Sequence, residues 1–213
     1  TIYAIEISMP LYIDGLYNKY QFAKTRKDFI KNYESFKKIN PQGYPSWSVN
    51  LVKKELLDNL DEDIFIFSGI ANETIYHCSE IKDYFESDQI YKSDRYGFNN
   101  PDFVYNEEID IVLVGDSFVH SSCVSQDKGY AGNLRNLFDK KGIVSIGWRG
   151  AGPFKELGML TEYALKLKPK YILWVYFEGN DYIEIVREQK YEILKNYLNE
   201  SFSQNLIERQ NEI

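Results

Sequence analysis

The sequence is poor in the residues that build disulfide scaffolds and metal sites. It contains two cysteines, Cys78 and Cys123, and two histidines, His77 and His120. Two cysteines cannot form a disulfide network, and the four residues lack the usual spacing of zinc ligands. We therefore expect no metal and no other cofactor. For the cysteines, two small buried thiols are the preferred interpretation, and a single bridge between them is the alternative.

Long apolar runs and basic runs are also missing. The longest apolar stretches, such as residues 171–177, fall far short of the roughly 18 residues of a membrane span, so we expect no transmembrane segment in this chain. The opening TIYAIEISMP lacks the basic start of a signal peptide, and its first residue is not Met, which leaves a missing upstream segment open. A net charge of −7 without Lys/Arg runs argues against nucleic acid or an anionic membrane surface as a partner. Small neutral or carbohydrate-like ligands remain candidates.

What the chain does contain is typical of a globular protein. Of its 213 residues, 44% are hydrophobic and 16% aromatic, which excludes intrinsic disorder. The character of the sequence changes near residues 99–101, where Asn-Asn-Pro marks a turn. We therefore divide the chain into an N-terminal α+β extension of unknown role, residues 1–105, and an α/β domain, residues 106–213.

The N-terminal part has mixed periodicity. Apolar residues at three- and four-residue steps predict an amphipathic helix over residues 22–39, and Ser48 is a suitable N-cap for a short second helix. Two β-like runs, residues 64–67 and 73–78, flank turn residues and favour a hairpin. The many aromatic residues of this part suit packing against the second part better than an open binding surface.

The second part alternates apolar strands with amphipathic helices. We predict strands at residues 109–115, 142–147 and 169–177, and helices at residues 129–141, 152–168 and 181–198. Continuous apolar strands between helices favour a parallel sheet that is covered on both faces. Right-handed crossovers then give a three-layer α/β sandwich with a flavodoxin-like sheet. In such sheets the functional residues lie at the carboxyl ends of the strands.

A serine follows the first of these strands. Ser117 comes directly after Gly115 and Asp116, at the expected start of a helix, where its hydroxyl would be fixed and its own amide N–H exposed. This placement suits a nucleophile, and capping of the following helix is the alternative interpretation. Val119 stands where a second glycine would complete a G-x-S-x-G elbow, which argues against an α/β-hydrolase site.

The other two strand ends carry hydrogen-bond donors. The second strand leads into a turn with Gly147, Gly150 and Gly152, whose N–H groups suit a developing negative charge, although a plain turn or a phosphate cradle remains open. The third strand ends near Asn180, whose side-chain amide can donate to the same charge or can serve as a turn and N-cap residue. The order G-x-x-G-x-G, without a P-loop lysine, disfavours a nucleotide site.

Together these three blocks resemble the SGNH, or GDSL-like, hydrolase family. GDSF at residues 115–118 is similar to its first block, the turn around Gly150 to its second, and GND at residues 179–181 to its third. The resemblance covers about half of the chain. It implies that Ser117 is the nucleophile, and that the Ser117 amide, the Gly150 amide and the Asn180 side chain form an oxyanion hole. It also implies an esterase or acyl (acetyl) transferase that acts on surface glycans in the bacterial cell envelope.

The sequence departs from this family in two places. Glu178 replaces the first glycine of the G-x-N-D block, and we expect it to be a solvated turn acid or a local hydrogen-bond partner. No D-x-x-H block, which supplies the family's general base, follows Asp181. His120 is interpreted as a packed or surface histidine, and His77 reaches the site only if the N-terminal part covers the strand ends. We therefore expect the remaining strands and the Asp/His pair beyond Ile213, so that the α/β domain is incomplete at its C-terminus.

The sequence thus favours a serine-dependent ester hydrolase or acyl transferase. It would form an acyl-enzyme on Ser117 and act on a small-molecule or carbohydrate ester. A noncatalytic glycan- or protein-binding module on the same scaffold is the alternative, which the many Tyr and Phe residues would suit. A flavodoxin-like nucleotide binder is the least favoured interpretation. The acyl group, the alcohol partner and the oligomeric state do not follow from the sequence.

Overall fold

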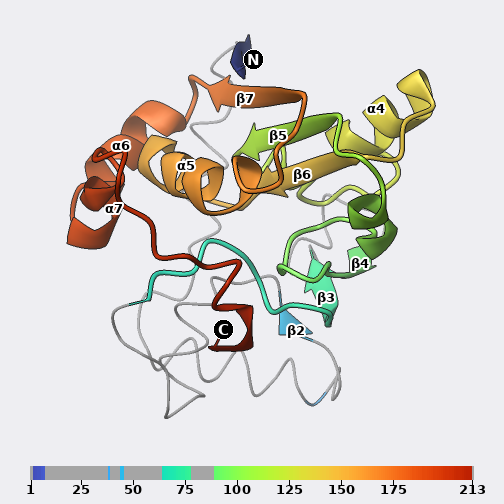
Figure 1. Ribbon diagram of the computed structural model, residues 1–213, viewed down its shortest axis with the longest axis horizontal. Coiled ribbons are helices and arrows are strands. Elements are labelled where there is room, and N and C mark those ends of the chain that lie inside the picture. The colour runs from blue at the N-terminus through green and yellow to red at the C-terminus, as the bar shows by residue number, and fades with distance from the viewer. Residues whose placement is uncertain (1, 8–37, 39–43, 46–63, 78–88, 213) are drawn as a thin grey trace.

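The fold is built around a parallel sheet. The computed structural model describes residues 2–7, 38, 44–45, 64–77 and 89–212 (Figure 1). Its sheet has four parallel strands in the order β1-β7-β5-β6, namely β1 (Ile2–Ile7), β5 (Ile111–Gly115), β6 (Ile143–Gly147) and β7 (Tyr171–Phe177). The α/β architecture and the three strands predicted in the second part are therefore confirmed.

Strand β1 was not expected from the sequence. It lies parallel to β7, from Ile2 opposite Ile172 to Ile7 opposite Phe177. The segment IYAIEI is rich in β-branched and aromatic residues, which fit a strand. Because its partner lies far along the chain, no local pattern indicates the pairing. The first residues of the chain thus belong to the same sheet as the strands of the second part.

Helices follow the strands of the second part much as predicted. They are α4 (Tyr130–Phe138), α5 (Pro153–Met159), the π-helix η3 (Leu160–Ala164) that continues α5, α6 (Asp181–Glu188) and α7 (Glu192–Asn196), with short 3-10 helices η2 (Asp102–Asn106) and η4 (Gln210–Glu212). The single helix predicted over residues 181–198 is therefore two helices, α6 and α7. Within the described ranges, no helix has the length and apolar character needed to cross a membrane.

Both faces of the sheet are buried. Val112 and Val114 of β5 point into the larger hydrophobic core, which α5, η3 and α7 help to form. Leu113 of β5 and Val175 of β7 point into a smaller core on the opposite face, where they meet Ala131 of α4. Successive side chains of a strand alternate between faces, so helices cover the sheet from both sides. This explains why the strands read as continuous apolar runs.

A small second sheet replaces the hairpin predicted in the N-terminal part. It consists of β2 (Tyr44–Pro45), β3 (Thr74–His77) and β4 (Gln89–Lys92), in which β3 is antiparallel to β4 and parallel to β2. The prediction was wrong because residues 64–67 form no strand. Their backbone is held by a distant side chain: Gln204 accepts from the N–H of Phe65 at 2.8 Å and donates to its carbonyl at 3.0 Å. The predicted helices over residues 22–39 and after Ser48 lie outside the described residues, except for Lys38.

The preferred interpretation of the cysteines is also wrong for Cys123, which is disulfide-bonded. The other cysteine of the sequence, Cys78, lies outside the described residues. Cys123 has a positive φ of 64°, so it lies in a turn whose backbone conformation is unfavourable for most residues. The bridge therefore tethers the loop that follows β5.

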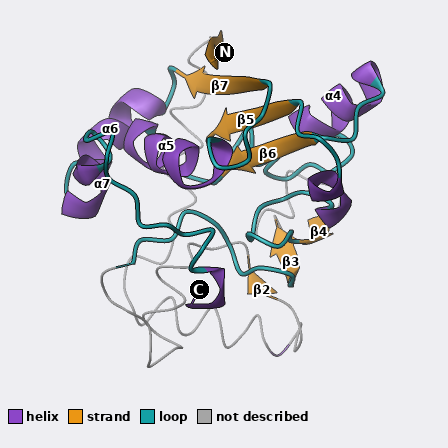
Figure 2. Ribbon diagram, viewed as in Figure 1, coloured by secondary structure: helices purple, strands orange, loops and turns teal. Residues whose placement is uncertain are grey.

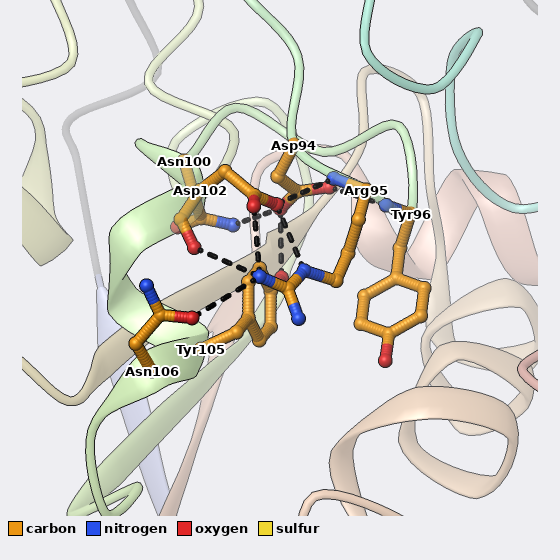
Figure 3. Close-up of polar contacts among 7 residues, drawn as sticks. All are labelled: Asp94, Arg95, Tyr96, Asn100, Asp102, Tyr105 and Asn106. Carbon is orange, nitrogen blue, oxygen red and sulfur yellow. Dashed lines mark hydrogen bonds and ion pairs between the residues drawn. The ribbon is translucent and has the colours of Figure 1, made fainter.

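The loop before η2 is fastened to the sheet by one asparagine. The Asn100 side chain accepts from the N–H of Ser145 and donates to its carbonyl, both at 2.8 Å, on the side of β6 that faces away from β5. The Asp94 carboxylate is fully buried and accepts from Asn100, from Tyr105 and from the backbone N–H of Tyr96 (Figure 3). It also accepts from the backbone N–H of Phe98. Nearby, the Arg95 guanidinium pairs with Asp102 at 2.8 Å on the surface. The predicted division after residue 105 thus falls within a tightly connected region.

Candidate functional site

The strand order puts the topological switch point of the sheet between β5 and β7. The chain passes from β5 to its neighbour β6 through α4, and then crosses over β5 to β7 through α5 and η3. In an open parallel sheet, the loops that follow the two strands at such a switch diverge to opposite faces and leave room for a ligand. Figure 2 shows the arrowheads of β5, β6 and β7 on the same side, toward α5 and α6. Ser117 and Asn180 follow β5 and β7 at this place.

We expected Ser117 at the start of a helix, but it lies in a loop made of successive turns. The next helix, α4, begins only at Tyr130, so helix capping does not explain this serine. Ser117 is partly exposed, and its carbonyl accepts from the N–H of Ser122 at 2.9 Å. The buried Asp116 carboxylate accepts from the N–H of Phe118 at 2.9 Å. The loop is therefore ordered by its own polar groups around the serine.

Asn180 occupies the N-cap position of α6, but its side chain does not cap the helix. Instead it reaches across to the neighbouring strand end, where its Nδ2 donates to Oδ2 of Asp116 at 3.1 Å. The Ser117 hydroxyl approaches the same oxygen at 3.5 Å. Two of the three predicted site residues therefore meet at one carboxylate oxygen. Asn180 is the N-cap residue through its backbone, whose carbonyl accepts from the N–H of Glu184 at 2.9 Å, while its side chain is directed to Asp116.

Gly150 differs from the other two glycines of its loop. A Cβ on Gly147 would lie 2.5 Å from the N–H nitrogen of His120, and one on Gly152 would lie 2.3 Å from Cβ of Glu184, so both are glycines for close packing. Gly150 has a positive φ of 63° and open space where its Cβ would be. Its carbonyl accepts from Nζ of Lys155 at 2.8 Å. Gly150 is thus the glycine of this loop whose conformation, and not its packing, requires the residue type.

The loop that carries Gly150 starts beside the end of β5. The N–H of Trp148 donates to the carbonyl of Gly115 at 3.2 Å, which keeps the two strand ends together beyond the sheet. No hydrogen bond connects Gly150 to Ser117 or to Asn180 among the described residues. Glu178, the departure from the family pattern, lies exposed in the turn before Asn180.

His120 is packed in the interior. It is fully buried, its Nε2 lies 3.1 Å from the Tyr91 hydroxyl, and its Nδ1 lies 3.3 Å from the Ser122 hydroxyl. Its ring is 4.7 Å from that of Trp148, centroid to centroid. Because both ring nitrogens face other groups, this histidine is not placed to take a proton from Ser117. The side chain of His77 lies outside the described residues.

Sequence reasoning missed a group of buried acids beside the site. Their side chains come from the loop after β5, from α5 and from α6, and each is less than a tenth exposed: Asp116, Glu156, Asp181, Glu184 and Glu188. One signal in the sequence could have indicated that Glu156 is buried. Glu156 precedes Met159, Leu160 and Tyr163 at steps of three, four and seven residues, so it lies on the apolar stripe of its helix.

Burial raises the pKa values of Asp116, Glu156, Asp181 and Glu188. It raises the pKa of Glu156 to about 9, with a further contribution from the negative charge of Asp181, and raises the pKa of Asp181 to about 7. The pKa of Asp116 is also raised by burial, although hydrogen bonds from Phe118 and Asn180 oppose the effect. Among the described residues, no group of three or more His, Cys, Asp or Glu side chains is arranged to hold a metal ion.

Comparison with known proteins gives no family for this chain. No protein-family model, no curated protein and no solved structure matches it. The sequence blocks and the geometry at the ends of β5 and β7 therefore carry the functional interpretation.

Proposed function

We propose that this protein is a serine-dependent ester hydrolase or acyl transferase of the SGNH type, on a flavodoxin-like three-layer sandwich. The observation that supports this most directly is the meeting of Ser117 and Asn180 at Oδ2 of Asp116. Residues far apart in the sequence, each predicted for one role in the same reaction, come together at the switch point of the sheet. The resemblance further suggests esters of bacterial surface glycans as substrates.

The reaction would begin with attack of the Ser117 hydroxyl oxygen on an ester carbonyl carbon. A base takes the hydroxyl proton, the new C–O bond forms, and the carbonyl oxygen becomes an oxyanion. Collapse of this intermediate breaks the original ester bond, and the leaving alcohol takes up the proton. Water, or a second alcohol, then attacks the acyl-enzyme and releases Ser117. Hydrolysis and transfer differ only in this last acceptor.

Asn180 suits the role of oxyanion donor because Asp116 fixes its amide. The carboxylate accepts one Nδ2–H, which sets the amide plane and assigns nitrogen and oxygen. The second Nδ2–H is then directed by the same contact. The Gly150 N–H would be a further donor, in a backbone conformation that glycine makes accessible. Groups fixed before the reaction stabilise the transition state without reorganising during it.

The mechanism also needs a general base. Both ring nitrogens of His120 face other groups, so the proposal assigns it no catalytic role. No other residue is assigned this role, so the tests of the proposal measure reaction at Ser117 directly.

The proposal is tested by labelling the full-length protein with a fluorophosphonate. We expect labelling that Ser117→Ala abolishes and that Asn180→Ala slows by about 100- to 1,000-fold, the usual cost of one oxyanion donor. Ser125→Ala, a serine of the same loop, is the matched control and should label normally. Absence of labelling in the folded full-length protein would overturn the proposal. Glycan binding without turnover that survives Ser117→Ala would favour the noncatalytic binding module.

A further inference from the structure

The buried acids beside the site divide into two groups by their partners. Glu188 accepts from the N–H groups of Gly152, Phe154 and Lys155 at 2.7, 3.0 and 3.2 Å, and Nζ of Lys155 lies 3.3 Å away. Glu184 pairs with Arg187. Each of these two acids has a cation and at least one donor. These partners offset part of the cost of burying the negative charge.

Within the part of the chain that the structure describes, Glu156 and Asp181 have neither an ion pair nor a full set of donors. Oε2 of Glu156 accepts from Nε1 of Trp174 at 2.7 Å, and Oδ2 of Asp181 accepts from the N–H of Phe177 at 2.6 Å. The second oxygen of each, Oε1 of Glu156 and Oδ1 of Asp181, has no partner although both side chains are fully buried. A buried carboxylate oxygen without a donor is costly, and a proton turns such an oxygen into a donor.

The surrounding charges favour one proton on this pair. The negative charges that act on Glu156 are those of Asp181, Asp116 and Glu188, and Glu184 also acts on Asp181. The cations of the neighbourhood, Lys155 and Arg187, pair with Glu188 and Glu184. Glu156 lies on α5 and Asp181 begins α6, which packs against α5, so a proton on Glu156 removes the repulsion between the two charges.

We propose that Glu156 is a carboxylic acid at neutral pH, that its proton relieves the repulsion between Glu156 and Asp181, and that this acid pair positions Asn180. The second part rests on the proposed function. Glu156 would be a positioning residue, because it acts on the reaction only through the turn that carries Asn180.

The connection from the acid pair to Asn180 is short. Asp181 closes the turn after β7 by accepting from the N–H of Phe177, and the N–H of Asn180 donates to the carbonyl of Phe177 at 3.3 Å. Trp174 of β7 holds the other end of the pair through Glu156. If Glu156 loses its proton, two buried carboxylates repel each other, and we expect the turn to open. The Asn180 amide would then leave Asp116.

The first test measures the proton itself. Infrared spectra of the full-length protein at neutral pH should contain the carbonyl band of a buried protonated carboxyl group, which disappears as the pH rises through about 9. Glu156→Gln should remove the band, and Glu192→Gln, which changes an exposed acid of α7, should not. A wild-type spectrum without the band, or a band unchanged in Glu156→Gln, overturns the acid pair whether or not the protein is an enzyme.

The second test measures positioning through the rate of fluorophosphonate labelling at Ser117. Glu156→Gln keeps a neutral N–H donor and should label within about threefold of wild type, whereas Glu156→Leu should label about 10- to 100-fold more slowly while its circular dichroism stays native. The wild-type rate should fall above about pH 9, and Glu156→Gln should lack this fall. Equal rates in Gln and Leu variants, or an unchanged alkaline fall in Glu156→Gln, would refute positioning. If wild type does not label at all, the proposed function fails, and the infrared test still decides the acid pair.

Discussion

Buried acids serve different purposes in two regions of this molecule. Glu162 of η3 accepts from the Tyr197 hydroxyl, from Ser203 and from the N–H groups of Gln204 and Leu206, at 2.5–3.0 Å. It thereby fastens the segment after α7 to the core. Glu156 of α5 is as deeply buried but has one donor. The fully bonded acid holds the chain together, and the poorly bonded one lies beside the candidate site.

The pKa values of Asp94 and Glu156 differ for a similar reason. Asp94 is fully buried, and burial raises its pKa only to about 6, because four donors stabilise the charged form. For Glu156, with its one donor and its acidic neighbours, the pKa is raised to about 9. The number of donors and the neighbouring charges, and not the depth of burial, therefore separate the two acids. A perturbed acid near a strand end is a functional candidate for this reason.

The sharpest way to break the comparison is to remove the fully bonded acid. Glu162→Ala would leave two backbone N–H groups and the Tyr197 hydroxyl without an acceptor in the interior. We expect the free energy of unfolding in urea to fall by about 3–5 kcal/mol, the usual cost of breaking a buried charged network. Glu208→Ala, an exposed acid nearby, is the control. A loss below about 1 kcal/mol would show that the number of donors does not measure the role of an acid in the fold.

The pH dependence of stability should separate the two kinds of acid. A carboxyl group whose pKa is raised in the folded state stabilises the fold below its ordinary pKa, and this stabilisation is lost as the pH rises through the folded value. Asp94 and Asp181 complete this loss by about pH 6 and 7, so the fall between pH 7 and 9 belongs to Glu156.

We therefore expect the free energy of unfolding of the wild type to decrease by at least about 1 kcal/mol from pH 7 to 9, and to stay level in Glu156→Gln. Urea unfolding curves at half-unit pH steps would measure both. The same slope in the two proteins would contradict the assignment of this proton to Glu156.

The smallest effect is expected at the glycine of the site. Gly150→Ala places a side chain in open space at a positive φ and should cost about 1 kcal/mol, whereas Gly152→Ala forces a Cβ against Glu184 and should cost more. Labelling at Ser117 should nevertheless fall further in Gly150→Ala, if the Gly150 N–H is an oxyanion donor. Thermal unfolding and labelling rates of both variants would reveal a reversed order.

Much of this fold can be predicted from local sequence patterns. The features that cannot be predicted depend largely on contacts between residues far apart in the sequence. The strands at β5, β6 and β7 could be predicted because each is a continuous apolar run, and their ends indicated Ser117 and Asn180. The conformation of the loop after β5 could not be predicted, because Ser121 and Cys123 have positive φ values that their residue types do not indicate. β1 and the role of Gln204 depend on partners far along the chain, which periodicity does not reveal.

The acid cluster shows a different limit of sequence reasoning. Glu156 has the spacing of a core residue, and its type alone suggests a surface position. Only the contacts of Trp174 and Phe177 show that both acids are bound to the same strand, β7. The role of a residue of this kind depends on its neighbours in space, and the helix that carries it gives only a hint.

The contact of Asn100 with β6 has a consequence for how these molecules behave at high concentration. The outer strand of an open sheet is a template onto which a strand of another molecule can add, and unprotected templates lead to aggregation. Here the N–H and the carbonyl of Ser145 already bond to a carboxamide, which imitates a neighbouring strand at one residue. A foreign strand must first displace Asn100, which Asp94 holds in place. A single side chain thus opposes addition of a foreign strand to β6 at this residue.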